Sequence, residues 1–208
     1  MYNEKDIIAQ WNADMYDLNE TYVDDVEFVL MLMGTTPKKV LEIACGSGFD
    51  VVTLGANFLF NIVADMNYEQ AQKLMIQKSA DALAVGGHIF VDYAYTHYPE
   101  KWFSNPDSNI IWEGTDSHGN FGKMVLLDNT YDTESRIARF VRRFDMILAD
   151  GSTLVQEIPS EKHFAALDQI HKWLDEAGFV IERECGDYQG NLISETTDRA
   201  IIWAGKVR

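Results

Sequence analysis

Two glycines behind a short apolar run are the residues of this chain whose types and spacing first suggest chemistry. Gly46 and Gly48 follow residues 40–44, a run of aliphatic and β-branched side chains that also contains Glu42. Such a run predicts a buried strand. Glycine has no Cβ atom to keep a ligand away from the backbone, and it adopts positive φ values without strain. The stretch therefore predicts a strand that enters a tight loop where a ligand contacts the backbone.

The elements around this loop indicate a parallel sheet. Residues 49–54 are rich in β-branched side chains and predict a second buried strand. A helix is expected over about 68–84, ended by the glycine pair at 86–87, and residues 88–93 predict a third strand. A strand, a helix and a strand in succession favour parallel pairing, with helices on the faces of the sheet.

The N-terminal region predicts two helices between residues 3 and 34. The second has an apolar stripe at helical spacing, formed by Val26, Val29, Leu30 and Met33. Gly34 is placed to end this helix.

The second half of the chain predicts an antiparallel meander. Three strand-like segments cover about 123–131, 136–148 and 153–158. The joints between them are so short that only antiparallel neighbours are expected.

A helix and two strands are expected to close the chain. Ser160 is placed to cap a helix that reaches residue 177, and His163 and His171 would lie on it in structural roles. Strands over about 179–184 and 200–207 follow, joined by a polar loop.

Composition and charge narrow the range of functions. The chain has 208 residues, of which 47% are hydrophobic, enough for one domain with a sizeable core. Lys and Arg number 17 against 33 Asp and Glu, and the resulting charge of -16 argues against nucleic acid as a partner. Two cysteines far apart, a polar N-terminus and no apolar run of about 20 residues predict a cytoplasmic protein without a membrane span. No set of residues resembles a metal site.

Two sequence blocks carry a resemblance to a known family. Residues 40–48, Val-Leu-Glu-Ile-Ala-Cys-Gly-Ser-Gly, resemble the first motif of the class I S-adenosylmethionine (SAM)-dependent methyltransferases: an apolar strand, an acidic residue and Gly-x-Gly. Residues 80–92 resemble a later block of that family, in which a helix ends in a glycine pair before a strand. The meander resembles that of small-molecule members of the glycine and sarcosine N-methyltransferase type, and the closing elements resemble the β-hairpin that ends the fold.

The resemblance implies an α/β fold: a Rossmann-like methyltransferase sheet with helices on both faces and a three-stranded antiparallel meander insertion. It implies one domain over 1–208, with an N-terminal helical cap at about 1–36 and the insertion at about 108–159. SAM is the implied cofactor, and a small molecule methylated on N, O or S is the implied substrate. The residues expected to bind SAM are Glu42, Ala44, Gly46, Gly48 and Asn57. Glu42 would hold the ammonium group of SAM directly or through water.

Under this resemblance, side chains at or just after the carboxyl ends of predicted strands surround the transferred methyl group. His97 and Tyr95 are the expected catalytic residues, because a histidine accepts a proton near neutral pH. Tyr93 is expected to contact the substrate. Arg139 and Arg143 share one face of a predicted strand, where either can bind a substrate carboxylate. Surface ion pairs are the alternative for both arginines, and a loop position without a role is the alternative for His97.

The spacing of the two glycine motifs departs from the family. About 40 positions separate Gly46 from Gly86, whereas a complete member has two crossovers of about 30 residues each in this interval. Residues 49–54 then correspond to the fourth strand of the family. Roughly 50 residues are expected to be absent at the Gly48–Phe49 join.

Alternatives stay open for both the strand assignment and the function. In a rival interpretation residues 49–57 form a short helix, 58–64 form the second strand, and Asp65 is the ribose ligand. If the full protein contains these residues and the numbering closes over them, the protein is an ordinary enzyme. If the chain is truly short, it is an inactive methyltransferase-like module for binding or assembly, whose open sheet edges would favour a homodimer.

Overall fold

The chain forms two compact units in a computed structural model. The described residues are 3–36, 38–42, 48–62, 67–103 and 109–208. The first unit comprises Met1–Tyr22 and Glu100–Glu161, and the second comprises Val23–Pro99 and Lys162–Arg208. The two helices of the predicted N-terminal cap therefore belong to different units.

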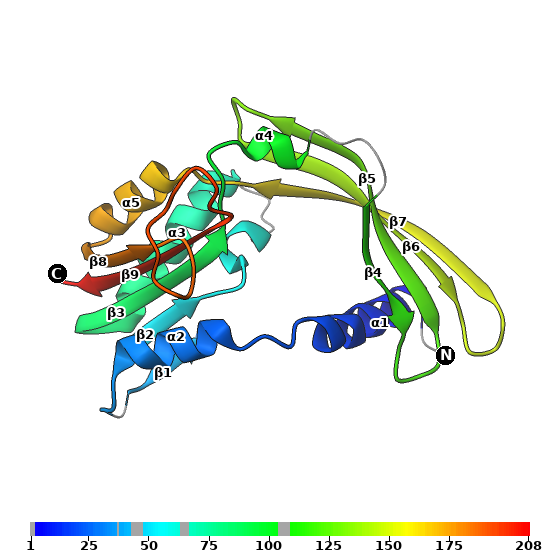
Figure 1. The fold of residues 1–208 in the computed structure, drawn as a ribbon, viewed down its shortest axis with the longest axis horizontal. Helices are drawn as coiled ribbons and strands as arrows, with labels where there is room; N and C mark the ends of the chain where they lie inside the picture. Colours follow the sequence, from blue (N-terminus) through cyan, green and yellow to red (C-terminus); the bar gives the residue numbers. More distant parts are fainter. Residues whose placement is uncertain (1–2, 37, 43–47, 63–66, 104–108) are drawn as a thin grey trace. The chain divides into compact units, whose positions relative to one another are not determined.

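A five-stranded mixed sheet is the centre of the second unit (Figure 1). Its strands are β1 (Val40–Glu42), β2 (Phe49–Leu54), β3 (Leu83–Ala94), β8 (Phe179–Cys185) and β9 (Arg199–Lys206). The order across the sheet is β1-β2-β3-β9-β8. The first three strands are parallel to one another, whereas β9 pairs antiparallel with both β3 and β8. The predicted parallel sheet and closing hairpin are confirmed.

β2 lies between β1 and β3 because its side chains suit a strand that is covered on both faces. Val51, Val52 and Leu54 are all buried, and β-branched side chains favour the extended backbone. The rival interpretation is wrong, since β2 is a strand and residues Phe58–Asn61 form the 3-10 helix η1. Asp65 lies outside the described residues.

Helix α3 (Tyr68–Ala82) ends earlier than predicted, and the glycine pair at 86–87 lies inside β3. The ammonium group of Lys206 explains this end. It donates hydrogen bonds to the carbonyl oxygens of Ala80 and Leu83, at 2.6 and 2.9 Å. A cation suits the negative end of the helix dipole. The helix therefore stops where Lys206 binds its carbonyl groups rather than at the glycines.

Helices cover both faces of this sheet, as predicted (Figure 1). On one face α3 and α5 (Leu167–Glu176) contribute Ile76 and Ile170 to the largest buried apolar cluster. On the other face α2 (Asp24–Met33) contributes Phe28 to a second cluster. None of the described helices is long and apolar enough to cross a membrane.

α2 turns a different stripe toward the sheet than the sequence predicts. Val26 and Leu30 are 52% and 55% exposed, whereas Phe28 and Val29 are buried. The Phe28 ring lies 6.0 Å from the Tyr188 ring, between centroids. Because burial of a large aromatic ring stabilises more than burial of valine, Phe28 sets the rotation of the helix.

α5 also begins later than predicted. Ser160 is not its cap, because β7 (Thr153–His163) continues through this position and the helix starts after Ala166. The Ser160 hydroxyl instead accepts a hydrogen bond from Nε of Arg142 at 2.9 Å. His163, predicted on the helix, is a buried strand residue.

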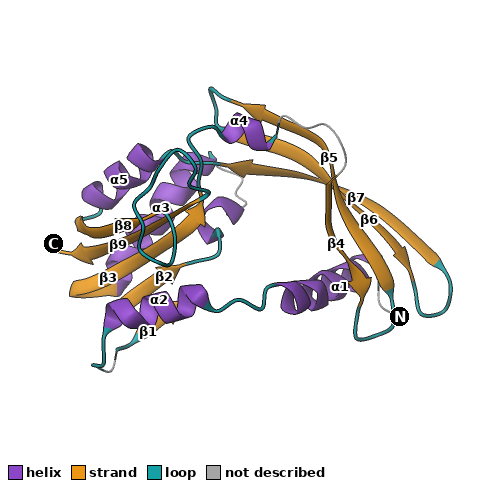
Figure 2. Cartoon of the chain, in the orientation of Figure 1, coloured by secondary structure: helices purple, strands orange, loops and turns teal. Residues whose placement is uncertain are grey.

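A four-stranded sheet with helix α1 (Glu4–Asn19) on one face is the centre of the first unit (Figure 2). Its strands are β4 (Asn109–Thr115), β5 (Phe121–Asp132), β6 (Ile137–Ile147) and β7, in that order. β5 pairs antiparallel with β4 and β6. The predicted meander corresponds to β5, β6 and β7, and β4 is a strand that the sequence did not predict.

Helix α1 (Glu4–Asn19) packs on this sheet through Trp11 and Met15, which are 0% and 1% exposed. Two glycines of the sheet make room for them. A Cβ atom on Gly122 would lie 2.5 Å from the Trp11 ring, and one on Gly114 would lie 2.7 Å from the Met15 sulfur. The Trp11 Nε1–H also donates to the Gly114 carbonyl oxygen at 3.1 Å. The helix is thus seated on a surface that any larger residue would block.

The link between β1 and β2 is unusually short. Only residues 43–48 join these two parallel neighbours, whose register aligns Glu42 with Thr53. Parallel neighbours ordinarily need a connection of about a dozen residues or more. Among the described residues β1 is an edge strand of the sheet. The predicted absence of residues at the Gly48–Phe49 join concerns this link, and it stays a prediction.

Candidate functional site

The carboxyl ends of the parallel strands β1, β2 and β3 share one edge of the sheet. In open α/β sheets this is the edge at which ligands bind. Glu42 ends β1, Asn57 follows β2, and Tyr95 and His97 follow β3. The structure therefore brings four of the predicted site residues to one edge.

Asn57 fastens the end of β2 to the end of β3. Its N–H donates to the Asp92 carbonyl oxygen at 3.2 Å, and its side-chain oxygen accepts a hydrogen bond from the Ala94 N–H. Both Ala56 and Asn57 have positive φ values, +50° and +62°. Such backbone is strained for residues other than glycine and is concentrated at functional sites. The Asn57 oxygen is used within the protein, which leaves the amide N–H groups for a ligand.

Tyr95 and His97 form a hydrogen-bonded pair. The Tyr95 hydroxyl lies 3.2 Å from His97 Nδ1, and the ring centroids are 5.2 Å apart. Burial, followed by the charges of Glu184 and Glu195, raises the pKa of Tyr95 above its ordinary value. Tyr95 is therefore neutral near pH 7, and its oxygen can accept a hydrogen bond from the Nδ1–H tautomer of His97. In that tautomer His97 Nε2 keeps the lone pair that accepts a proton.

Tyr93 is the last residue but one of β3, and its side chain is buried. Its side chain is 0% exposed, and its ring lies 5.1 Å from the Phe60 ring. The hydroxyl has no hydrogen-bond partner among the described residues. Burial raises the pKa of Tyr93 well above its ordinary value. Contact with a substrate stays a prediction for this residue.

Gly48 does not lie at the same edge of the sheet as Glu42 and Asn57. It directly precedes β2 and so lies at the amino end of that strand, where its N–H donates to the Ala82 carbonyl oxygen at 2.8 Å. Its φ of +80° is the positive value that the sequence led us to expect of a glycine. Ala44 and Gly46 lie outside the described residues.

Arg139 and Arg143 belong to the first unit, where both form ion pairs. Arg139 Nε lies 2.7 Å from Glu161, and Arg143 binds Asp145 at 2.9 Å and Glu157 at 3.4 Å. The hydrogen bond and the charge of Asp145 raise the pKa of Arg143. These pairs match the surface alternative, and substrate binding by either arginine stays a prediction.

A buried polar cluster next to the carboxyl edge was not predicted. Asp92 is 1% exposed, and it accepts hydrogen bonds of 2.6 Å from the Tyr188 hydroxyl and from the Arg199 guanidinium. Arg199 also donates to the Tyr188 oxygen at 2.9 Å, with its guanidinium 4.9 Å from the centre of the ring. The cluster joins β3, β9 and the loop between β8 and β9. The sequence contains one indication of this cluster: Asp92 stands within an otherwise apolar strand, where a carboxylate needs partners.

The charges in this cluster depend on one another. Burial, then the hydrogen bond and charge of Asp92, raise the pKa of Tyr188. Burial by itself lowers the pKa of Arg199, but the charge and hydrogen bond of Asp92 outweigh it and the net shift is upward. Tyr188 is therefore neutral and Arg199 charged over the physiological pH range.

Three metal-ligand side chains lie together in the first unit, although the sequence predicts no metal site. The ligand atoms of Asp14, Asp116 and His118 are within 4.8 Å of one another. Hydrogen bonds already occupy both carboxylates. Asp14 accepts from the Ser117 N–H and hydroxyl at 2.7 and 2.6 Å, and Asp116 accepts three bonds from His118 and Asn120. These bonds brace the turn between β4 and β5 against α1.

Solved structures with a similar fold are SAM-dependent methyltransferases. One from Clostridium acetobutylicum ATCC 824 has a TM-score of 0.57 and 15% identity, over 80% of this chain and 62% of that chain. The CcbJ methyltransferase from Streptomyces caelestis has a TM-score of 0.58 and 11% identity, over 80% and 61%. A SAM-bound amino pentose methyltransferase from Micromonospora echinaspora, involved in calicheamicin biosynthesis, has a TM-score of 0.55 and 13% identity, over 79% and 61%.

These similarities support the fold class predicted from the sequence. The chain has the mixed α/β fold of those structures, with a central sheet flanked by helices. It spans about three fifths of their length. No protein-family model matches the chain, and no curated protein does.

Proposed function

We propose that this protein is a SAM-dependent methyltransferase that transfers a methyl group to an N, O or S atom of a small molecule. One observation carries the proposal: the sheet has three parallel strands, the first of which is followed in the sequence by Gly-x-Gly, and solved structures with a similar fold are methyltransferases. The glycine and sarcosine N-methyltransferase type, a homodimer and a cytoplasmic location remain predictions from the sequence.

In this proposal the amino-acid part of SAM has assigned ligands, whereas its adenosine part has none among the described residues. A carboxylate suits an ammonium group, and the resemblance to the family's first motif assigns this role to Glu42. Asn57 offers amide N–H donors at the same edge. No described strand pairs with the outer edge of β1, the side on which a neighbouring strand would contact ribose and adenine. We therefore expect the affinity for SAM to come mainly from contacts with its amino-acid part.

When bound, SAM supplies an electrophilic methyl group. Tyr95 and His97 are then the groups that handle the proton of the acceptor. With the Nδ1–H of His97 bound to the Tyr95 oxygen, Nε2 can take the proton of an ammonium acceptor, which frees the nitrogen lone pair before methyl transfer. It can equally take the proton of a hydroxyl acceptor as the oxygen is methylated. The catalytic contribution of the chain is to position the acceptor and to remove its proton.

An amine is the acceptor class to screen first. Similar structures include the amino pentose methyltransferase and a sugar N-methyltransferase from Streptoalloteichus sp. ATCC 53650, the latter with a TM-score of 0.56 and 11% identity. A screen of amino sugars and amino acids with methyl-labelled SAM, read by mass spectrometry, identifies the acceptor. With SAM and an acceptor that the screen identifies, His97→Gln should lower kcat by about 10²–10⁴-fold if His97 is the general base.

Calorimetric titration with SAM tests the proposal directly. We expect the folded chain to bind SAM with a Kd of about 1–100 µM, near −8.2 to −5.5 kcal/mol. Glu42→Gln should weaken binding about tenfold, because it removes the negative charge that the family resemblance assigns to the ammonium group of SAM. Asp81→Asn, on the exposed face of α3, is the matched control and should leave the Kd unchanged. Absence of binding by a chain with native circular dichroism and the expected intact mass would exclude the proposed activity.

A further inference from the structure

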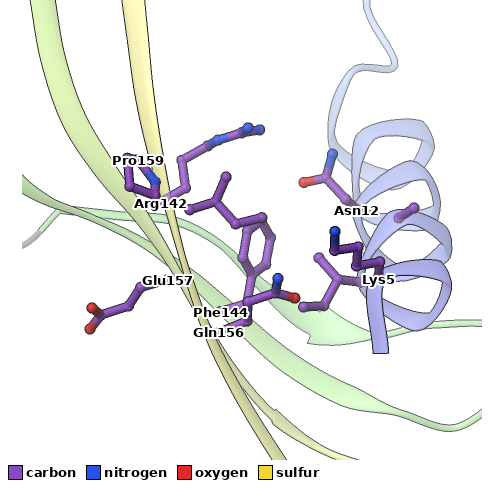
Figure 3. Close-up of a pocket in the computed structure, with 10 residues that line it drawn as sticks. Lys5, Asn12, Arg142, Phe144, Gln156, Glu157 and Pro159 are labelled. Atoms are coloured by element: carbon purple, nitrogen blue, oxygen red, sulfur yellow. The ribbon is translucent and has the colours of Figure 1, made fainter. Parts of the chain in front are cut away.

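A cavity of about 520 Å³ lies wholly within the first unit, between α1 and the strands β6 and β7 (Figure 3). Cavities that hold small molecules are commonly of about 300–1,000 Å³. None of the residues assigned above to SAM or to proton transfer lines it. The observations that indicate a ligand in this cavity therefore do not depend on the proposed methyl transfer.

The cavity has an arginine that is held in place but has no anion. Arg142 lies on the same face of β6 as Phe144, the face that α1 covers. Its Nε donates to the Ser160 hydroxyl at 2.9 Å, which orients the guanidinium. Arg139 and Arg143 have carboxylate partners, but no described carboxylate forms an ion pair with Arg142. A planar guanidinium with free N–H groups suits a ligand carboxylate.

The other charges around the cavity also favour a ligand with a carboxylate. Lys5 of α1 lines the cavity and forms no ion pair with a described residue. Glu157 is the only carboxylate among the lining residues, and it binds Arg143 at 3.4 Å. In Figure 3 the Glu157 carboxylate points away from Lys5 and Asn12. In a protein with a net charge of -16, two free cations at one cavity provide a local site for an anion.

Two buried oxygen atoms at this cavity have no hydrogen-bond donor. They are Asn12 Oδ1 on α1 and Gln156 Oε1 on β7, both without a partner among the described residues. Figure 3 shows the Asn12 side chain extending from α1 toward the sheet and the Gln156 side chain extending from the sheet toward α1. Unpaired buried acceptors destabilise a fold, so two at one cavity indicate donors that come from a ligand.

The remaining wall is apolar. Phe144 and Ile8 line the cavity and are 1% and 4% exposed. A ligand that satisfies all of these groups carries a carboxylate, at least one N–H or O–H donor, and a small apolar body. We propose that this cavity binds a small amino acid or hydroxy acid, with its carboxylate on Arg142 and Lys5 and its amine or hydroxyl on Asn12 and Gln156.

Titration calorimetry of the full chain with a panel of probes tests this assignment. The panel contains the proteinogenic L-amino acids, the matching 2-hydroxy acids, and the matching amines that lack a carboxylate. We expect at least one acid to bind with a Kd below about 1 mM, and its amine counterpart not to bind at that concentration. The comparison between amino acid and hydroxy acid identifies which donor the cavity prefers. No binding by any acid of the panel overturns the proposal.

Matched variants locate the binding. Arg142→Met should weaken the affinity for the most tightly bound acid at least tenfold. Arg136→Met, which removes an arginine just before β6 that does not line the cavity, should leave this affinity within twofold. Gln156→Leu should also weaken binding while raising the melting temperature of the free protein, since it removes an unpaired buried oxygen. Equal affinity in Arg142→Met and the parent chain overturns the proposal. Arg142→Met should not change SAM binding, so the two proposals fail independently.

Discussion

At the scale of single residues, Asp92 shows how a charge is kept inside this sheet. A lone buried carboxylate is strongly unfavourable, but Tyr188 and Arg199 both donate to Asp92, at 2.6 Å each. The three side chains come from β3, from β9 and from the loop between β8 and β9, so the cluster fastens the closing hairpin to the parallel strands. A cluster of this kind stabilises the fold only as long as all of its members are present.

Tyr188→Phe should lower the free energy of unfolding by about 1–3 kcal/mol at pH 7, because it removes a hydrogen bond to a buried carboxylate. Urea unfolding followed by circular dichroism measures this difference. Tyr22→Phe is the matched control, since Tyr22 is 83% exposed, and its effect should stay within about 0.5 kcal/mol. Equal losses in the two variants would contradict the role given to Tyr188.

The same tyrosine predicts a dependence on alkaline pH. Burial and Asp92 raise the pKa of Tyr188 in the folded state, whereas an unfolded tyrosine has a pKa of about 10. Above that pH the unfolded chain loses the proton and the folded chain keeps it. The stabilisation is therefore complete below about pH 10 and is lost as the pH rises further. The unfolding free energy of Tyr188→Phe should fall less steeply between about pH 10 and 11.5 than that of the parent chain. Identical slopes would show that Tyr188 titrates normally.

At the scale of elements, the ends of the helices are decided by partners from distant parts of the chain. α3 ends at Ala82 because Lys206 of β9 binds the carbonyl oxygens of Ala80 and Leu83. α5 begins after Ala166 because the Ser160 hydroxyl is bound by Arg142 and its backbone continues β7. Each interaction also connects an element to the strand that packs beside it.

Lys206→Met should lower the free energy of unfolding by about 1–3 kcal/mol, because two carbonyl oxygens at the end of α3 lose a charged donor. Methionine keeps most of the apolar stem, so the loss reports on the ammonium group. Lys78→Met is the control, since Lys78 forms an exposed pair with Asp81 and should change stability by less than about 0.5 kcal/mol. Thermal and urea unfolding of both variants measure the difference. A loss no larger than that of Lys78→Met would refute the account of this helix end.

At the scale of the whole molecule, charge and connectivity are the unusual properties. Asp and Glu exceed Lys and Arg by 16, so like charges repel throughout the folded chain. Two parallel strands are joined by residues 43–48 alone, and the chain spans about three fifths of the similar methyltransferases. The excess of negative charge lowers the stability of the fold, and this effect can be measured without knowing the substrate.

Sodium chloride should raise the melting temperature at pH 7. Screening shortens the range of repulsion from about 30 Å at 0.01 M salt to about 8 Å at 0.15 M, and we expect a rise of roughly 2–5 °C over this interval. The effect should shrink near pH 4.5, where the calculated net charge of the chain is close to zero. A melting temperature that falls with salt at pH 7 would show that favourable ion pairs outweigh the repulsion.

Local patterns predicted most of the elements. Apolar runs bounded by glycine or turn residues predicted β2, the closing hairpin and three strands of the meander, and Gly34 ends α2 as expected, with a φ of +69°. The positive φ of Gly48 also followed from its type. These features depend on backbone preferences and on side-chain spacing within a few residues, which the sequence carries directly.

The tertiary structure decided which side chains have partners. The sequence indicated Arg139 and Arg143, but only Arg142, on the opposite face of the same strand, has no ion pair among the described residues and lines a cavity. Likewise, the partners of Asp92 lie about a hundred positions away in the chain. The sequence by itself therefore determined most of the strands and helices, and the net charge. Burial, ion pairing and the ends of the helices required the fold, because long-range contacts bring together residues that no local pattern relates.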